Sequence, residues 1–327
     1  MSSDRILVTT EIGKDAKQVI REVLEPIASV YFLQDTVDRI GDLSEATVLM
    51  SFFFNREVQK EEYGLLKKTK LLQTISTGVD YLPFKEIPDH IRIVCNAGGW
   101  AYQIAEHTVA LALALYKRLI PNHNNLARGD FNRGSFLLRN LKGKTLGVVG
   151  FGGIGKYTAK IMKSMGVRVM ALNTRGNTEE EVDFIGTLDE LTFLLKEADI
   201  VLLSLPLTKK TVGLIGKKEL EMMKQDAMII NVARAPLMEE KALYEHLRDN
   251  PEFLAALDVW WEEPSWSENS FRTNFPFFDL PNFIGSPHNS NYVEGSFEEA
   301  SRIAAENVRR FLVDGQLKGN INREDYL

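Results

Sequence analysis

The sequence has only one cysteine, Cys95, so no disulfide bond can form within the chain. Cys95 ends the apolar run 91–95, where we interpret it as a buried strand residue rather than a reactive thiol. A lone thiol fits a reducing compartment. Clustered cysteines or histidines at metal-ligand spacing are also lacking, so we expect no metal site.

The chain also lacks an excess of positive charge and a long apolar run. Its 39 basic and 45 acidic residues give a formal net charge of -6. This charge argues against nucleic acid as a partner, because basic patches hold phosphate backbones, but it does not exclude a small anionic substrate. The longest apolar helical stretch, residues 109–116, is too short to span a bilayer, and the N-terminal residues contain no signal-peptide core. We therefore expect a cytoplasmic protein with no membrane partner.

Apolar runs alternate with amphipathic segments along the 327 residues, a length that favours about two domains. The first series predicts strands at 5–10, 30–33, 46–54, 71–76 and 91–95. The second series predicts strands at 146–149, 167–172, 199–206, 227–233, 253–259 and 282–288. Such continuous apolarity is typical of parallel strands covered on both faces. We predict an α/β protein with two doubly wound parallel sheets, a Rossmann nucleotide-binding domain and a flavodoxin-like substrate domain.

Helical spacing predicts the connections between these strands. Helices are expected at 15–24, 102–119, 188–196, 239–248 and 292–314, with a charged helical segment at 57–70. The polar, glycine-containing stretch 122–135 is expected to connect the two domains. Periodicity alone does not decide which domain the last helix packs against.

The stretch 145–155, TLGVVGFGGIG, is a short apolar run that ends in a glycine-spaced turn and continues into a helical pattern. Its three spaced glycines have the GxGxxG pattern of a dinucleotide-binding turn. The first allows the turn, the second lets the backbone approach a pyrophosphate, and the third lets helix and strand pack closely. The expected cofactor contacts are Gly150, Gly152, Gly153, Ile154 and Gly155. Since the same spacing occurs in ordinary loops, that alternative stays open at this point.

Charged and polar residues lie at the ends of four predicted strands. Arg234, His288 and residues 77–80 each lie at the end of one strand, and Asp258 and Glu263 lie at the end of another. Ligands bind beyond the carboxyl ends of parallel strands, so we expect these residues to meet a ligand. An arginine for the anion and carbonyl, a histidine for the proton and a glutamate to hold the histidine suit hydride transfer to a carbonyl.

Several unrelated short motifs identify a family when they are taken together. They are GVD at 78–80, IAEH at 104–107, GFGGIG at 150–155, LPLT at 205–208, NVAR at 231–234, DVWWEEP at 258–264 and SPH at 286–288. In this order, over nearly the whole chain, they resemble the D-isomer-specific 2-hydroxyacid dehydrogenases. The resemblance implies an oxidoreductase that transfers hydride between NAD(P)H and a small 2-oxo acid, such as glyoxylate or hydroxypyruvate, to give a D-2-hydroxy acid.

The resemblance also implies the roles of individual residues. Arg234 is expected to bind the substrate carboxylate and carbonyl, His288 to exchange the proton, and Glu263 to pair with His288. A neighbouring carboxylate favours a charged imidazolium, which suits a proton donor. The expected substrate contacts are the backbone of Thr77, Gly78 and Val79 and, as a further candidate, the side chain of Phe53. Asp258 is expected near the nicotinamide carboxamide, with Thr108, Pro206 and Ala233 beside the cofactor.

The implied domain organisation is discontinuous. Residues 1–101 and 291–327 are expected to form the substrate domain, to which the last helix returns, and residues 102–290 the nucleotide-binding domain. The resemblance further implies a homodimer formed through the nucleotide-binding domain. His107 is interpreted as a structural residue near the domain junction.

The residues after the strand 167–172 bear on the choice of cofactor. In NAD-binding forms of this fold an acidic residue about 20 positions beyond the glycines binds the ribose hydroxyls. Here the strand is followed by Asn173, Thr174 and Arg175. These side chains can donate to a 2′-phosphate, which a carboxylate would repel. Our hypothesis is that NADP(H) is preferred over NAD(H); the alternative is that Arg175 is a solvated loop residue and both cofactors are accepted.

Two other functions stay open. A formate dehydrogenase-like enzyme is disfavoured, because the corresponding family resembles this one with a glutamine in place of Glu263. A dinucleotide-sensing, corepressor-like interaction protein is not excluded by the residues. The chain departs from the family at Ala235, where glycine is usual, and in the long aromatic segment 265–280. That segment contains Trp266 and several phenylalanines, and is interpreted as a lid, a dimer contact or an anchored surface loop.

Overall fold

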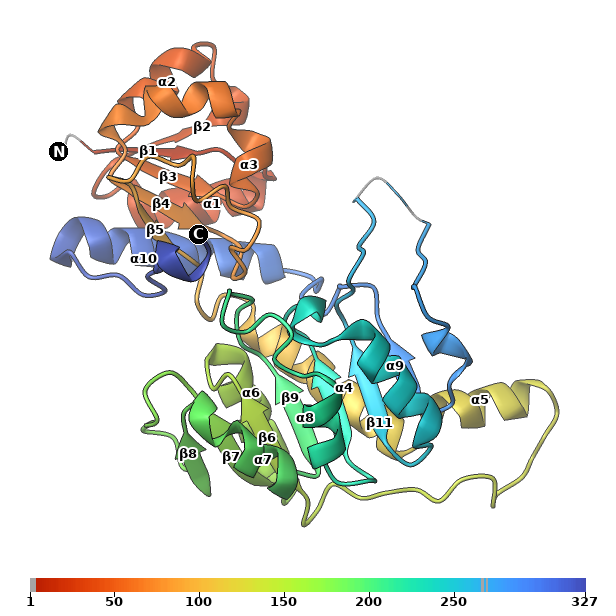
Figure 1. Ribbon diagram of the computed structural model, residues 1–327. Helices are drawn as coiled ribbons and strands as arrows, with labels where there is room; N and C mark the ends of the chain where they lie inside the picture. Colours follow the sequence, from red (N-terminus) through yellow and green to blue (C-terminus); the bar gives the residue numbers. More distant parts are fainter. Residues whose placement is uncertain (1–3, 266–267, 269) are drawn as a thin grey trace. The chain divides into compact units, whose positions relative to one another are not determined.

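The chain folds into two compact units, which we describe separately. The computed structural model describes residues 4–265, 268 and 270–327. Unit 1 comprises Met1–Trp100 and Val293–Leu327, and unit 2 comprises Ala101–Tyr292. Each unit contains one sheet, and all strand pairs among the described residues are parallel (Figure 1). The predicted α/β fold class with two parallel sheets is confirmed.

The sheet of unit 1 has the strand order β2-β1-β3-β4-β5. Its strands are β1 (Arg5–Val8), β2 (Ser29–Phe32), β3 (Val48–Ser51), β4 (Leu71–Thr74) and β5 (Arg92–Val94). This is the flavodoxin-like order, in which the direction of winding reverses between β1 and β3. The carboxyl ends of these two strands therefore mark the place where such a sheet usually receives a ligand.

Helices cover both faces of the unit 1 sheet. They are α1 (Lys14–Leu24), α2 (Arg39–Glu45), α3 (Phe54–Glu57), the 3₁₀ helices η1 (Leu33–Asp35), η2 (Lys60–Lys68) and η6 (Arg323–Asp325), and α10 (Ser296–Asp314). Because successive strand residues point to opposite faces, Leu7, Leu49 and Leu72 pack together with residues of α2, α3 and η2. On the opposite face α10 packs against α1, and Asn307 of α10 donates a hydrogen bond from Nδ2 to Oε1 of Gln73 over 2.6 Å.

The sheet of unit 2 has the strand order β12-β11-β10-β9-β6-β7-β8. Its strands are β6 (Thr145–Val149), β7 (Arg168–Leu172), β8 (Phe184–Gly186), β9 (Ile200–Leu203), β10 (Met228–Asn231), β11 (Leu254–Leu257) and β12 (Phe283–Gly285). Counted from β6, the first six strands have the order 3-2-1-4-5-6 of a Rossmann domain, and β12 adds a seventh. The winding reverses between β6 and β9, so the expected ligand position lies at the ends of these strands.

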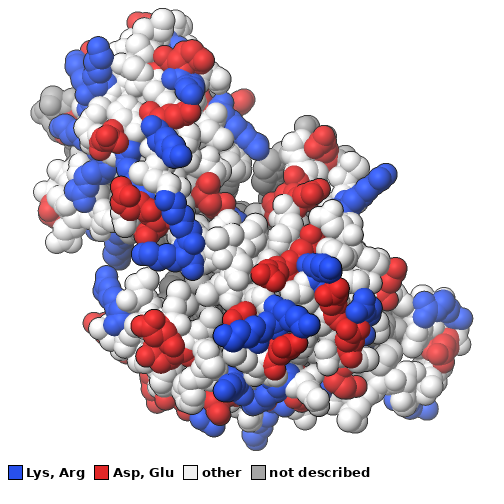
Figure 2. Space-filling model, viewed as in Figure 1, with Lys and Arg blue, Asp and Glu red and all other residues white. Residues whose placement is uncertain are grey.

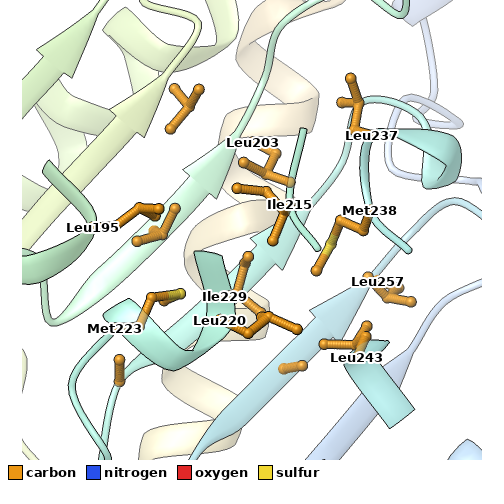
Figure 3. Packing of buried hydrophobic residues seen from close by; sticks show 14 of the residues in the cluster. Leu195, Leu203, Ile215, Leu220, Met223, Ile229, Leu237, Met238, Leu243 and Leu257 are labelled. Atoms are coloured by element: carbon orange, nitrogen blue, oxygen red, sulfur yellow. The ribbon is translucent and has the colours of Figure 1, made fainter. Parts of the chain in front are cut away.

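Two apolar layers hold the unit 2 sheet between helices. The helices are α4 (Ala101–Tyr116), α5 (Leu119–Ala127), α6 (Gly153–Ser164), α7 (Leu191–Glu197), α8 (Lys217–Met222), α9 (Glu240–Asp249), and the 3₁₀ helices η3 (Leu188–Glu190), η4 (Ala235–Leu237) and η5 (Phe277–Asp279). Leu203, Ile229 and Leu257 face α7, α8 and α9, and Figure 3 shows them packed with Leu220 and Leu243. The intervening strand residues face α4 and α6. Both faces are therefore buried, which explains the continuous apolarity of these strands.

Three local predictions differ from the structure. The stretch 122–135 does not connect two domains; it lies within unit 2, and its first residues belong to α5. The predicted helix 102–119 is interrupted at Arg118, whose φ of 47° is left-handed, so α4 ends at Tyr116 and α5 starts at Leu119. The predicted strand 46–54 ends at Ser51, because the chain turns there into α3.

The surface carries charges of both signs. Figure 2 shows basic and acidic side chains interspersed on the visible face of each unit. This mixture agrees with the small net charge of -6. Among the described helices, none combines the length and apolarity needed to cross a bilayer.

Candidate active site

The glycine turn lies directly after β6, where the winding of the unit 2 sheet reverses. Gly150 has a left-handed φ of 101°, and a Cβ atom at this residue would lie 2.6 Å from the backbone nitrogen of Leu205. At Gly155 a Cβ atom would lie 2.6 Å from Cγ1 of Val148, so the missing side chain allows helix α6 to approach the strand. At Gly152 a Cβ atom would meet no heavy atom within 4 Å, which leaves the backbone bare on that side.

The start of helix α6 presents backbone donors at this bare turn. No side chain caps the helix N-terminus at Gly152. The first hydrogen bond inside the helix runs from the Lys156 nitrogen to the Gly152 oxygen, so the N–H groups of Gly153, Ile154 and Gly155 precede it. These N–H groups and the positive end of the helix dipole fit a phosphate group. The residues present therefore fit the pyrophosphate of a dinucleotide.

The residues that follow β9 pack against the glycine turn. Ser204 donates a hydrogen bond from Oγ to the backbone oxygen of Gly150 over 2.9 Å. Pro206, which was predicted beside the cofactor, is exposed two residues farther along. Ala233, also predicted there, is half-buried after β10. Thr108 is fully buried in α4, and its hydroxyl donates to the Ile104 carbonyl oxygen over 2.7 Å.

The turn after β7 has a fixed backbone and exposed donors. Asn173 accepts hydrogen bonds from the N–H groups of Arg175 and Gly176 at Oδ1, and its Nδ2 donates to the Asn177 oxygen over 2.8 Å. Asn173 therefore shapes the turn. Thr174 and Arg175 are exposed, so these two side chains are the ones that the turn presents to solvent.

Arg234 lies on a loop that a buried asparagine holds in shape. Asn231 is fully buried at the end of β10; its Oδ1 accepts from the Ala233 nitrogen over 3.0 Å, and its Nδ2 donates to the Arg234 oxygen over 2.8 Å. Arg234 is half-buried and donates from its guanidinium to the Ala233 oxygen over 2.8 Å. Ala235 then starts the 3₁₀ helix η4, so the departure from glycine at this position is accommodated without a left-handed backbone.

His288 and Glu263 form the predicted pair. Nδ1 of His288 lies 2.8 Å from Oε2 of Glu263, and both side chains are about one-third exposed, at 38% and 36%. Oε1 of Glu263 accepts from the Trp260 nitrogen over 3.0 Å. Burial raises the pKa of Glu263, but the hydrogen bond and charge of His288, the Trp260 N–H and the charge of Arg234 together lower it below its ordinary value. Glu263 is therefore ionised at neutral pH, and its Oε2 accepts a hydrogen bond from the Nδ1–H group of His288.

A buried carboxylate holds the loop that carries His288. His288 has a left-handed φ of 51°, which is uncommon for a residue with a side chain. Asp258 is fully buried and accepts from Ser286 Oγ over 2.6 Å and from the nitrogens of Asn289 and Ser290 over 3.2 Å each. Hydrogen bonds on both sides of His288 therefore hold the strained residue in place.

His107 extends this network from helix α4. Its Nε2 lies 2.9 Å from Ser286 Oγ and 3.8 Å from Asp258 Oδ1. Because the single hydroxyl proton of Ser286 goes to Asp258, Ser286 Oγ accepts from His107, and the His107 proton lies on Nε2. The indole nitrogen of Trp260 also donates to the Ser286 backbone oxygen over 2.9 Å. The residues that support the site but carry no site role predictable from the motifs are His107, Ser286, Trp260 and Asn231.

In unit 1 the predicted substrate contacts lie on two loops. Thr77 is exposed after β4, its Oγ1 donates to the Asn96 oxygen over 3.0 Å, and Gly78 follows it half-buried. Val79 is buried in the apolar layer of this unit, so only its backbone is available for a ligand. Phe53 is half-buried after β3, and its ring packs against Tyr81 with centroids 5.6 Å apart.

The described part of the aromatic segment 265–280 packs on unit 2 through three phenylalanines. Phe277 is fully buried, Phe275 stacks on Tyr244 with centroids 5.2 Å apart, and Phe271 meets Trp260 at 4.7 Å. This packing holds the described residues Phe271, Phe275 and Phe277 against unit 2. Trp266 lies outside the described residues.

Residues 4–265, 268 and 270–327 contain no group of three or more histidine, cysteine, aspartate or glutamate side chains that could hold a metal ion. Burial raises the pKa of the Cys95 thiol to about 11, so it stays protonated at neutral pH. Cys95 is half-buried and follows β5 instead of lying within it, so the interpretation as a buried strand residue is wrong, whereas the protonated thiol agrees with an unreactive cysteine.

Comparison with known proteins identifies the family. Residues 109–290 match the family model described as the NAD binding domain of D-isomer specific 2-hydroxyacid dehydrogenases. A curated glyoxylate reductase from Thermococcus litoralis is 30% identical over 279 residues, which cover 83% of this chain and 82% of the relative. The chain belongs to the D-isomer specific 2-hydroxyacid dehydrogenase family, and the predicted family is confirmed.

Particular relatives differ in their names. A D-3-phosphoglycerate dehydrogenase from Methanocaldococcus jannaschii is 32% identical over 321 residues, covering 97% of this chain but only 59% of the relative. The chain thus spans about three-fifths of the length of that relative. A glycerate dehydrogenase related protein from Thermoplasma acidophilum is 30% identical, with a TM-score of 0.64 and coverage of 94% of this chain and 99% of that one. An acyclic imino acid reductase in complex with NADPH and D-Arg is 25% identical, with a TM-score of 0.75 and coverage of 97% and 100%.

Proposed function

We propose that the chain is an oxidoreductase that reduces a small 2-oxo acid to a D-2-hydroxy acid with a nicotinamide dinucleotide. The observation that carries this proposal is the 2.8 Å contact between His288 Nδ1 and Glu263 Oε2. Both residues lie beyond carboxyl ends of strands in the sheet that also carries the glycine turn. A histidine held by a carboxylate is suited to proton exchange with a carbonyl oxygen.

His288 is proposed as the acid and base of the reaction. Its Nδ1 is engaged by Glu263, so the proton exchanged with the substrate oxygen is carried on Nε2. Glu263 fixes the ring orientation and the tautomer. The left-handed backbone of His288, held through Asp258, keeps the ring in one position before the substrate arrives.

Arg234 is proposed to bind the substrate carboxylate and to polarise its carbonyl. A guanidinium can bind an anion through two parallel hydrogen bonds, which fixes orientation as well as position. In unit 1 the backbone of Thr77, Gly78 and Val79 is proposed as a further contact of the carboxylate, and Phe53 as a contact of the rest of the acid. The two units are thereby proposed as the substrate domain and the nucleotide-binding domain.

The cofactor supplies the hydride when it is bound. Gly150 to Gly155 would hold its pyrophosphate, with Pro206, Thr108, Ala233 and Asp258 proposed near its remaining groups. For Asp258 we propose a second role, because its carboxylate accepts hydrogen bonds from Ser286, Asn289 and Ser290 and so holds the His288 loop.

A panel of 2-oxo acids tests the proposed activity. Purified protein is mixed with each acid and with NADPH or NADH, and the loss of nicotinamide absorbance is measured. Turnover is expected with at least one small acid such as glyoxylate or hydroxypyruvate. Turnover with no acid would contradict the proposal and would favour a dinucleotide-sensing interaction protein. Reduction of the dinucleotide by formate would favour the formate dehydrogenase-like alternative.

We further propose that NADP(H) is preferred over NAD(H). The support is the absence of a carboxylate after β7 in residues 173–175 and the exposed guanidinium of Arg175. Arg175→Ala is expected to lower kcat/KM for NADPH by about 10–100-fold, because charge-assisted hydrogen bonds to the 2′-phosphate are lost. NADH lacks this phosphate and serves as the internal control, with kcat/KM expected to change little. A native preference for NADH would contradict the proposal.

We also propose that the protein forms a homodimer through unit 2. Helix α5 has no buried residue, and Leu126 and Leu137 are 55% and 92% exposed. A cavity of about 480 Å³ lies beside this helix and is lined by Ile120, Phe136 and Phe278, among others. Exposed apolar groups in such number favour contact with a second copy.

Sedimentation of the purified chain tests the dimer. The unmodified chain is expected to sediment as a dimer, and the double variant with Leu126→Asp and Leu137→Asp as a monomer, because two charges would be buried in the contact. Val37→Asp, at a fully exposed apolar residue of unit 1, is the control and should leave the dimer intact. A monomeric unmodified chain would contradict the proposal.

A further inference from the structure

The carboxylate of Glu57 lies at the point where the winding of the unit 1 sheet reverses. Glu57 is the last residue of α3, which follows β3, and its side chain reaches the residues that follow β1. In a parallel sheet with this strand order, a ligand normally occupies the ends of these two strands. Here hydrogen-bond donors at that place point at a carboxylate of the chain itself.

Hydroxyl groups from both strands donate to Glu57. Thr9 Oγ1 lies 2.7 Å from Oε2, and Ser51 Oγ lies 2.5 Å from the same oxygen. Thr10 Oγ1 lies 3.0 Å from both carboxylate oxygens. The Thr9 hydroxyl also lies 3.2 Å from the Met50 oxygen, but the charged and closer acceptor is the stronger one.

The same carboxylate holds the backbone after β3. Oε1 of Glu57 accepts from the Phe53 nitrogen over 2.8 Å, and the Phe52 nitrogen lies 3.3 Å away. The Phe52 nitrogen also donates to Thr10 Oγ1 over 2.7 Å, so Thr10 links this N–H to Glu57. All five groups around the carboxylate are neutral. The negative charge is thus stabilised by oriented dipoles, as a bound oxyanion would be.

A second set of contacts joins this segment to the loop after β4. Tyr81 Oη donates to the Phe52 oxygen over 2.6 Å and lies 3.0 Å from Ser76 Oγ. The Phe52 backbone is therefore held on one side by Glu57 and Thr10 and on the other by Tyr81. Residues 77–79, which are proposed to contact the substrate carboxylate, lie between Ser76 and Tyr81.

We propose that Glu57 is an internal anion that fills the ligand position of the first sheet and positions the segment Ser51–Phe53 for substrate binding. This inference rests on the proposed function, because the substrate contact of Phe53 belongs to it. Glu57 is a positioning residue and does not itself touch the substrate. Its neutral donors are matched to a carboxylate, so a small free carboxylate can replace it when the side chain is removed.

Acetate rescue of Glu57→Ala tests this proposal. KM for the 2-oxo acid is expected to be about 10–100-fold higher in the variant, because the segment Ser51–Phe53 would shift and Phe53 would no longer hold the substrate in position. The cofactor Kd should stay within about twofold, because unit 2 is untouched. Acetate, compared with chloride at equal ionic strength, should restore KM saturably and raise the thermal unfolding midpoint of the variant. Glu61→Ala, which removes an exposed acid of η2, should show neither change.

The outcomes separate this inference from the proposed activity. An unchanged KM in Glu57→Ala, or an equal effect of acetate on Glu61→Ala, would overturn the role of Glu57. If Glu57→Ala does not fold, Glu57→Gln keeps the size and one accepting oxygen, and its KM should rise by a smaller factor. An unchanged KM in Glu57→Gln would likewise overturn the proposal. If the unmodified chain reduces no 2-oxo acid, the proposed activity fails, while the effect of acetate on unfolding still tests the anion site.

Discussion

Replacing His288 with alanine is expected to lower kcat by about 10²–10⁴-fold, the usual contribution of a positioned acid or base. The variant loses the ring whose Nδ1 lies 2.8 Å from Glu263, and with it the group that exchanges the proton at Nε2. The cofactor should still bind, because the glycine turn lies on other strands. Steady-state rates and the fluorescence of bound NADPH measure these two quantities separately.

A second histidine variant is the control for this experiment. His90 is exposed in unit 1, and its Nε2 lies 3.2 Å from the Leu66 oxygen. His90→Ala should therefore keep nearly all turnover. If His288→Ala also kept near-native turnover, His288 would not be the acid and base of this reaction.

Arg234→Ala is expected to lower kcat/KM for the 2-oxo acid by about 10²–10⁴-fold. Two charge-assisted hydrogen bonds to the substrate are lost, and each contributes about 1.5–3 kcal/mol. Much of the loss should appear in KM, since the guanidinium is proposed to bind the carboxylate before the reaction. The loop itself should keep its shape, because Asn231 binds the backbone at Arg234 and not its side chain.

Arg234→Lys separates charge from geometry. It keeps the positive charge but cannot form the planar, two-pronged contact, so it is expected to recover only part of the loss. Initial rates over a range of acid concentrations give kcat and KM for both variants. Unchanged reduction of the 2-oxo acid by Arg234→Ala would show that the anion binds elsewhere.

Local patterns in the sequence predicted the features that depend on neighbouring residues. The glycine turn is predictable because Gly150 and Gly155 occupy positions where a Cβ atom would clash, so the required spacing is visible in the sequence. The buried strands are predictable because both faces of each sheet are covered, which requires unbroken apolar runs. The placement of Arg234 and His288 at the ligand edge follows from the strands that precede them.

Contacts between distant residues were not predictable in the same way. His107 and Ser286 are 179 positions apart but share a hydrogen bond of 2.9 Å, and neither residue type indicates this partner. Glu57 belongs to a charged stretch that also fits a solvated helix surface, and only the fold brings Thr9 and Ser51 to its carboxylate. Positioning residues of this kind depend on tertiary contacts that leave no periodic signal.

Exposed helices and strands were also hard to predict, because their sequences show no clear hydrophobic pattern. Helix α5 contains no buried residue, so its sequence lacks the amphipathic spacing that identifies a helix packed on a core. Strand β8 has only three residues at the edge of its sheet, with Phe184 and Ile185 only half-buried, and it was not predicted. Asn173, Thr174 and Arg175 are predicted to donate to a phosphate. In the structure the Asn173 side chain instead forms hydrogen bonds with the backbone of its own turn.

Chiral analysis of the product tests the central claim most directly. The unmodified protein is incubated with NADPH and the 2-oxo acid that gives the fastest loss of nicotinamide absorbance. The account predicts the D-2-hydroxy acid, formed in an amount equal to the NADPH consumed. Formation of the L-acid, or consumption of NADPH without a hydroxy acid, would contradict it.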